Sequence, residues 1–277
     1  MKLQDYIQYW DNEIKKWLSS PQEVAPQNKG VQCDYMPEPF MGNPKKHSFV
    51  IVNLNPGIGV CHSWFPLKSM QGTLINKVAC SSYSEAVMDF PYLKDEESTK
   101  LSNWENNPGR LWWKSKEKWI KHILGICYPT ENFNKNGIVN HLPFAMELFG
   151  WHSKSFLNSY ITENYSNNKF KNCVIQPLID AIRNSDFKFA FCVGKPIGDI
   201  LVSYGDYRFI SFPLGSPLKN GGFIVNAGNT SRNYRVMSDG KDHYIINTWV
   251  QGGNTFPAPS YNIIEKQIMS HIFQHNR

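Results

Sequence analysis

The sequence predicts an α/β protein with three layers, α/β/α, around a central and mostly parallel sheet. The run 48–54 is almost wholly apolar, as expected of a strand that is buried on both faces in a parallel sheet. Short β-rich runs alternate with helical patterns along the rest of the chain, which is typical of β-α-β units. With 277 residues, of which 41% are hydrophobic, the chain can bury a large core, and we expect one sizeable α/β domain.

The individual elements follow from apolar spacing. Residues 3–18 place apolar side chains three to four residues apart, which predicts an amphipathic N-terminal helix that packs on the main domain. Further helices are expected near 109–126, 174–184, 195–204 and 260–274, and further strands near 137–141, 187–193, 207–212, 222–226 and 243–248. The predicted organisation is therefore an N-terminal helix and irregular lead-in at 1–36, followed by an α/β domain at 37–277. Within it, the segment 64–108 is either a surface insertion or a region that covers a substrate.

Composition limits the classes of function. Lys and Arg exceed Asp and Glu by 29 to 23, and the resulting charge of +6 suits a polyanionic partner without proving one. The six cysteines form no C-x-x-C pair, so we expect neither a metal nor an iron–sulfur cluster. No run has the apolar length of a membrane span, and the first residues do not form a signal peptide. We therefore expect a cytoplasmic protein with reduced thiols and no membrane partner.

The turn after the run 48–54 is the first candidate for a site. It reads Asn55-Pro56-Gly57-Ile58-Gly59, and Pro and Gly at these positions make a tight loop whose N–H groups can approach a ligand closely. The active site of an open α/β sheet lies beyond the carboxyl ends of its strands, where this turn is expected. The alternative is an ordinary connection after a strand.

Several stretches carry a family resemblance. The segments Pro37-Glu-Pro-Phe-Met-Gly-Asn-Pro44 and Val50-Ile-Val-Asn-Leu-Asn-Pro-Gly57 together resemble the first motif of the uracil-DNA glycosylase superfamily. The similarity is greatest to the branch written G-I-N-P-G or G-M-N-P-G, found in mismatch-specific and single-strand-selective enzymes, although Asn53 replaces the first Gly. Stretches 107–113, 137–144, 189–196 and 243–257 are similar to later segments of that family.

The resemblance implies a monofunctional DNA glycosylase that flips a base out of DNA and hydrolyses its N-glycosidic bond without a metal or cofactor. Asn55 would hold the attacking water, or alternatively satisfy the backbone of its turn. Asn140 would read a flipped pyrimidine with its amide, or alternatively cap a helix that starts at Pro143. Gln251 and Asn254 stand where relatives carry a catalytic His. These weaker donors, next to two glycines, suggest slow turnover or a base larger than uracil, such as a hypermodified phage pyrimidine.

Other side chains are candidates for contact with the base and the duplex. Pro56 and Gly57 would line the base pocket, and Trp64 or Phe65 would stack on the flipped base or else pack in the core. Phe256 lies on a proline-rich tip, and in the family this loop enters the duplex and fills the space of the flipped nucleotide. The alternative for Phe256 is a buried anchor of the C-terminal helix.

The implied partner is single- or double-stranded DNA, bound by a monomer. Basic residues expected on turns around the site would contact phosphates, although such side chains are usually just solvated. These are Lys45, Lys46, Lys195, Arg232 and Arg235. Two other functions fit the same sequence: a non-catalytic reader of modified or damaged DNA, and a nucleoside or nucleotide hydrolase. DNA repair and anti-phage defence are both open as the role of a glycosylase.

Overall fold

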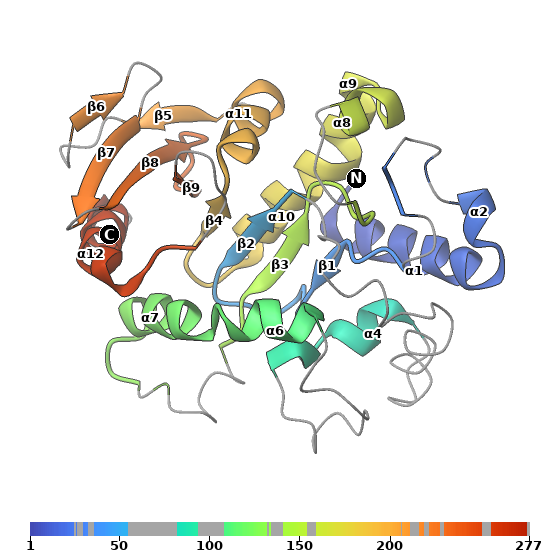
Figure 1. The fold of residues 1–277 in the computed structure, drawn as a ribbon, viewed down its shortest axis with the longest axis horizontal. Coiled ribbons are helices and arrows are strands. Elements are labelled where there is room, and N and C mark those ends of the chain that lie inside the picture. Colours follow the sequence, from blue (N-terminus) through green and yellow to red (C-terminus); the bar gives the residue numbers. More distant parts are fainter. Residues whose placement is uncertain are drawn as a thin grey trace.

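The computed structural model describes most of the chain. The residues described are 1–24, 26, 30–32, 36–54, 82–93, 108–131, 133, 141–153, 159–205, 207–210, 216–218, 222–227, 230–250 and 256–275. They form a mixed α/β fold, in which helices cover both faces of one sheet (Figure 1). This arrangement is compatible with the predicted three layers.

The sheet has a parallel centre and antiparallel ends. Its order is β1-β3-β2-β4-β9-β8-β7-β6, and β5 pairs with β8. The strands are β1 (Phe40–Met41), β2 (Val50–Asn53), β3 (Phe144–Glu147), β4 (Phe189–Val193), β5 (Arg208–Ile210), β6 (Ser216–Leu218), β7 (Gly222–Ala227), β8 (Thr230–Ser238) and β9 (Tyr244–Trp249). Strands β3, β2, β4 and β9 are mutually parallel, whereas β1 and the strands beyond β9 pair antiparallel. The prediction of a mostly parallel sheet is therefore confirmed for its centre.

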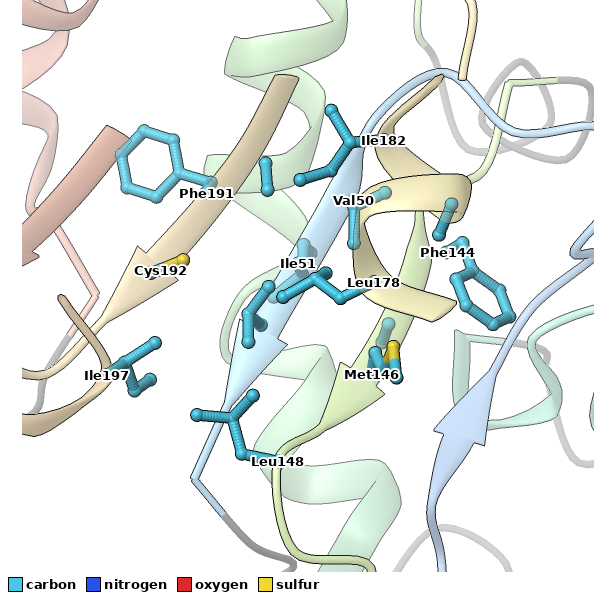
Figure 2. Close-up of a cluster of buried hydrophobic side chains, with 14 of the residues drawn as sticks. Val50, Ile51, Phe144, Met146, Leu148, Leu178, Ile182, Phe191, Cys192 and Ile197 are labelled. Carbon is cyan, nitrogen blue, oxygen red and sulfur yellow. The ribbon is translucent and has the colours of Figure 1, made fainter. Parts of the chain in front are cut away.

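The central strands are buried because helices cover both of their faces. In the parallel register, Val50 lies beside Phe144 on one side and Ala190 on the other, and the whole of β2 is buried. Figure 2 shows Leu178 and Ile182 among the buried apolar side chains around β2. A strand in this position needs a continuous apolar run, which is the pattern that predicted it.

The helices divide between the two faces. They are α1 (Leu3–Ser19), α2 (Pro21–Val24), α4 (Tyr83–Val87), α6 (Pro108–Lys114), α7 (Glu117–Cys127), α8 (Ser159–Asn164), α9 (Asn167–Phe170), α10 (Gln176–Asn184), α11 (Lys195–Tyr204) and α12 (Asn262–His275), with short helical turns at Pro91–Leu93, Lys171–Ile175 and Pro259–Tyr261. Trp119 of α7 packs against Phe191, whereas Gly198 of α11 packs against Asn247. Adjacent residues of a strand point to opposite faces, and Asn247 pairs with Cys192, so α7 and α11 cover opposite faces of the sheet.

The N-terminal helix belongs to the main core. The apolar stripe of α1 is buried, with Trp17 only 1% exposed, and the helix packs against α10. The Asp180 carboxylate of α10 also accepts a hydrogen bond from the Leu3 N–H of α1, at 3.2 Å. The predicted helix is therefore confirmed, and it packs on the main domain as expected.

Part of the segment 64–108 also belongs to the core. Residues 82–93 include α4, whose Tyr83 hydroxyl donates a hydrogen bond to the Phe40 carbonyl at 2.6 Å. Phe90 is 0% exposed and its ring meets that of Trp113 edge to face. These described residues therefore pack in the core and do not form a surface insertion.

Candidate functional site

The order of the parallel strands indicates where a ligand would bind. The chain passes from β2 to β3 on one side, and then to β4 and β9 on the other side of β2. Ligands of open α/β sheets bind outside the carboxyl ends of the strands at the point where the order reverses, which here lies between β2 and β4. We call this side of the sheet the carboxyl edge.

Two of the predicted turns continue from the carboxyl edge. Leu54, the residue after β2, immediately precedes Asn55, and Val250, the residue after β9, immediately precedes Gln251. The predicted residues of these two segments lie outside the described residues; they are Asn55, Pro56, Gly57, Trp64, Phe65, Gln251 and Asn254. Their described neighbours nevertheless share one edge of the sheet.

The residue that follows Asn140 lies at the opposite edge. Asn140 itself is outside the described residues, but the carbonyl of His141 accepts a hydrogen bond from Ser48 Oγ at 2.8 Å. Ser48 precedes β2, and the six residues to Leu54 span about 20 Å of extended chain. The strand that the structure describes in this part of the chain is β3, which begins at Phe144, after the range expected from the sequence.

Lys45 and Lys46 also lie on the amino side. Both are exposed and precede β2, and the neighbouring His47 places its Nε2 2.9 Å from the carbonyl of Ala181, near the end of α10. Burial lowers the pKa of His47, against the opposing effect of its contacts with backbone carbonyls. The two lysines therefore do not surround the carboxyl edge as predicted.

Arg232 is a structural side chain. It is 2% exposed, and its guanidinium donates hydrogen bonds to Thr248 Oγ1 at 3.1 Å and to the Phe256 carbonyl at 3.2 Å. These bonds join β8 to the end of β9 and to the start of the C-terminal segment. The predicted phosphate contact is replaced by this internal role, because the guanidinium is buried.

Arg235 has a similar role on the other face of the sheet. It is 2% exposed, donates to Asp199 Oδ1 at 2.7 Å and to the Lys195 carbonyl at 3.3 Å, and lies 4.3 Å from the centre of the Trp249 ring. Burial favours the neutral form of Asp199, but the hydrogen bonds from Lys195 and Arg235 prevail and lower its pKa. Arg235 therefore holds the start of α11 against the end of β9 and does not reach a phosphate.

Lys195 remains at the predicted place. It begins α11 directly after β4, and its side chain is 51% exposed and pairs with Asp199 at 2.6 Å. Gly194 precedes it with a φ of 125°, a backbone conformation that only glycine adopts readily. This cation therefore lies at the carboxyl edge with Asp199 as its counter-ion.

An amide that sequence reasoning missed fixes this turn. Asn247 of β9 is buried and donates to the carbonyls of Cys192 at 3.3 Å and Gly194 at 2.9 Å. A Cβ on Gly198 would lie 2.2 Å from Asn247 Oδ1, so helix α11 approaches the strand more closely than any other residue would allow. The carboxyl end of β4 is thus rigidly positioned.

The most distinctive group at the carboxyl edge is the pair Asn53 and Glu147. The two residues end adjacent parallel strands, and Asn53 Nδ2 donates to Glu147 Oε1 at 2.9 Å. Oε2 of Glu147 is buried and has no hydrogen-bond partner in the described part of the chain. Burial raises the pKa of Glu147 to about 8, against the opposing hydrogen bond from Asn53 and with a smaller contribution from Glu38. Burial therefore favours the neutral carboxylic acid form of Glu147.

A second carboxyl lies beside this pair. Glu38 precedes β1, and its N–H donates to the Gly150 carbonyl, just beyond the end of β3, at 2.9 Å. Tyr92 donates a short hydrogen bond to Glu38 Oε1, and His152 Nε2 lies 3.9 Å from Glu38 Oε2. Sequence reasoning missed Glu38 and Glu147 because β3 was expected earlier in the chain, which left Glu147 without a position at a strand end.

Comparison with known proteins does not add a family. No protein-family model, curated protein or solved structure matches the chain. Within the described residues, no three His, Cys, Asp or Glu side chains form a group that could hold a metal ion. None of the helices in the described ranges combines the length and hydrophobicity needed to cross a membrane.

Phe256 occupies the boundary between the core and the surface. Its half-buried ring lies 4.8 Å from that of Trp119 and 5.7 Å from that of Trp112, measured between centres. The ring of Phe256 therefore packs on α6 and α7 and does not project alone into solvent.

The chemical capacity of the carboxyl edge follows from these groups. A neutral carboxylic acid can donate a hydrogen bond or a proton to an atom that gains negative charge. Asn53 fixes its orientation by occupying the other oxygen, and Lys195 offers a positive charge at the adjoining strand end. The carboxyl edge thus holds a buried, oriented carboxyl group and a partly exposed cation at neighbouring strand ends.

Proposed function

We propose that this chain is a DNA glycosylase of the uracil-DNA glycosylase type, which removes a uracil-like or modified pyrimidine and leaves an abasic site. The observation that carries the proposal is the reversal of strand order between β2 and β4, at the edge from which the segments of Asn55 and Gln251 continue. The resemblance of these segments to glycosylase motifs indicates the reaction that we propose, and the net charge of +6 favours a polyanionic substrate.

The reaction requires two charges to be stabilised. As the bond between C1′ and the base nitrogen breaks, the sugar becomes positive and the electron pair stays on the base. Asn55 holds a water whose oxygen bonds to C1′, and that water loses a proton to solvent. Glu147 donates a hydrogen bond to the base as it gains negative charge and keeps its proton, and the released base anion takes up one proton from solvent.

This assignment changes two parts of the sequence-based mechanism. The base contact moves from Asn140 to Glu147, because Glu147 ends a strand at the carboxyl edge and His141 lies at the other edge. Relatives carry a His in the second motif that donates a hydrogen bond to the base. Here the neutral carboxyl of Glu147 takes that role, and Gln251 and Asn254 assist as weaker donors.

The test is base release from defined oligonucleotides. Purified protein is incubated with DNA that contains uracil, a mismatch or a phage-type modified pyrimidine; mass spectrometry measures the free base, and alkali reveals abasic sites. Asn55→Ala should lower the rate at least about 100-fold, since positioning of the water is lost. The exposed Asn12 of α1 provides the matched control, Asn12→Ala, which should leave the rate unchanged.

The pH profile tests Glu147 separately. The rate should fall about tenfold per unit as the pH rises above about 8, because the donor form of Glu147 is then lost. Glu147→Gln should remove this dependence, and the exposed Glu85, as Glu85→Gln, should not.

If the protein binds modified DNA without releasing a base, it is a non-catalytic reader; if it cleaves free nucleosides and ignores duplex DNA, it is a nucleoside hydrolase. Either result overturns the proposal.

A further inference from the structure

The junction of α6 and α7 exposes apolar rings beside a cation. Trp112 is 40% exposed and Leu111 is 52% exposed, although both are large apolar side chains. Lys116 Nζ lies 4.8 Å from the centre of the Trp112 ring and 5.3 Å from that of Phe256. We call Trp112, Lys116 and Phe256 the aromatic platform.

The platform is held in place by buried rings. Trp112 meets Trp113 edge to face at 4.6 Å, and Trp113 is 5% exposed and packs on Phe90. Phe256 packs in the same way on the buried Trp119. The exposed ring of Trp112 is thus pre-positioned, and a ligand that stacks on it loses little side-chain entropy.

Lys116 has no carboxylate partner among the residues that the structure describes, unlike Lys114 and Lys121 beside it. Lys114 and Lys121 both pair with Glu117, at 2.6 and 2.7 Å. Lys116 contacts only the Ser115 hydroxyl, at 2.6 Å, among the polar groups that the structure describes, and burial lowers its pKa. A half-buried ammonium in this state favours an incoming anion.

The platform lies on the same side of the sheet as the carboxyl edge. Helix α7 runs against the strands, because Trp119 near its start packs over the middle of β4, and Tyr128, just after its end, is 3.0 Å from Ser48 Oγ at the amino edge. Lys116 precedes α7 and is therefore directed toward the carboxyl edge. Phe256 also lies near the carboxyl edge, because its carbonyl accepts a hydrogen bond from Arg232, which lies beside the end of β9.

The charge of this region matches a nucleic acid strand. Residues 114–121 contain four Lys and one acidic side chain, Glu117. Aromatic rings that stack on bases, interleaved with cations that contact phosphates, are the combination that binds single-stranded nucleic acid. A nucleotide offers both a flat base for the exposed ring and a phosphate for the ammonium of Lys116, within the spacing of one residue of the strand.

We propose that the aromatic platform binds one nucleotide of a single-stranded DNA segment, with its base stacked on Trp112 and its phosphate paired with Lys116. The inference rests on the proposed action on DNA, and it adds a second nucleotide site next to the one that holds the excised base. Phe256 forms the floor of this site and keeps Lys116 above the rings.

The test is the affinity of the full chain for an unmodified, fluorescently labelled oligothymidine, measured by anisotropy. Trp112→Ala should weaken binding about 5- to 150-fold, the range for loss of one base stack, and Trp112→Tyr should retain most of the affinity. Tyr9→Ala removes an equally exposed ring from α1, 43% exposed, and should have no effect.

Lys116 is tested by salt dependence. Lys116→Gln should reduce the slope of log affinity against log salt by about 0.7, the value for one phosphate contact on a single strand. The exposed Lys15 of α1, as Lys15→Gln, is the control outside this region and should leave the slope unchanged. Thermal unfolding of each variant verifies that it is folded.

The outcomes separate this inference from the proposed function. Loss of affinity in Trp112→Ala with retention in Trp112→Tyr supports the platform, even if no base is released by the wild type. Unchanged affinity in folded Trp112→Ala overturns the platform, even if base release depends on Asn55. Equal losses in Trp112→Ala and Tyr9→Ala also overturn it, because the effect is then not specific to this site.

Discussion

Replacement of Glu265 by glutamine tests the electrostatics of the helical layer next to the platform. Glu265 of α12 is 0% exposed, and its Oε1 accepts hydrogen bonds from Trp119 Nε1 at 3.3 Å and from the Tyr234 hydroxyl at 3.5 Å. Its Oε2 lies 3.4 Å from His122 Nε2. Burial raises the pKa of Glu265 to about 8, although these hydrogen bonds and Arg232 act in the opposite direction.

The size of the effect follows from proton linkage. A folded state that holds the carboxyl proton to about pH 8 binds more protons than an unfolded chain with the ordinary pKa of 4.5. The associated stability is complete below pH 4.5 and is lost progressively as the pH rises toward 8. Between pH 4.5 and pH 7 the loss is about 3 kcal/mol, at about 1.4 kcal/mol per pH unit. Glutamine avoids it, because its amide is always neutral and still accepts from Trp119.

The assay is urea-induced unfolding of the wild type and Glu265→Gln at pH 4.5 and pH 7. The difference in free energy of unfolding between the two proteins should change by about 3 kcal/mol in favour of the variant as the pH rises. Glu85→Gln, at an exposed position of α4, should show a change below about 0.5 kcal/mol. A constant difference between wild type and Glu265→Gln would refute the reasoning, since Glu265 would then be ionised in the folded protein.

Two further predictions concern packing. Gly198→Ala should destabilise the fold by about 1–3 kcal/mol, because its Cβ would lie 2.2 Å from the hydrogen-bonded amide of Asn247; Gly125→Ala in α7, with nothing within 4 Å, should instead be neutral or stabilising by up to about 1 kcal/mol in the same urea assay. Trp17→Ala should cost about 3–5 kcal/mol, since α1 shares the main core and Trp17 is 1% exposed. The exposed Lys15, as Lys15→Ala, should change the melting temperature little, and a small effect at Trp17 would show that α1 is an independent addition.

Elements with strong periodicity could be predicted from the sequence. The helix 3–18 and the strand 48–54 were recognisable because burial of one face or both faces leaves a pattern in the chain. The start of α11 was recognisable from Gly194 and Pro196, which suit a turn followed by the first residues of a helix.

Elements that depend on distant partners could not be predicted in the same way. Strand β3 has only four residues, and its pairing with β2 selects Phe144 as its start where local propensity favoured 137–141. Strand β8 contains Arg232 and Arg235, whose burial depends on partners in β9, in α11 and near Phe256. No pattern within β8 marks these polar residues as internal.

The candidate site likewise has one part that the sequence could predict and one part that it could not. The turn after β2 could be located, since a buried strand followed by Pro and Gly is a local signal. The pair of Asn53 and Glu147 could not, because it exists only once two strands separated by 90 residues of chain lie in register. The raised pKa of Glu147 depends on that register and on the burial that follows from it.

The position of Arg232 and Arg235 on one strand limits the insertions and deletions that this part of the chain can accept. They lie three residues apart, so they project to opposite faces, one toward the C-terminal segment and one toward the start of α11. A shift of β8 by one residue along its partner strands would turn each arginine to the opposite face of the sheet. Both arginines would then lose the hydrogen bonds that hold the chain on either side of the carboxyl edge. Insertions or deletions within β8 are therefore constrained to an even number of residues.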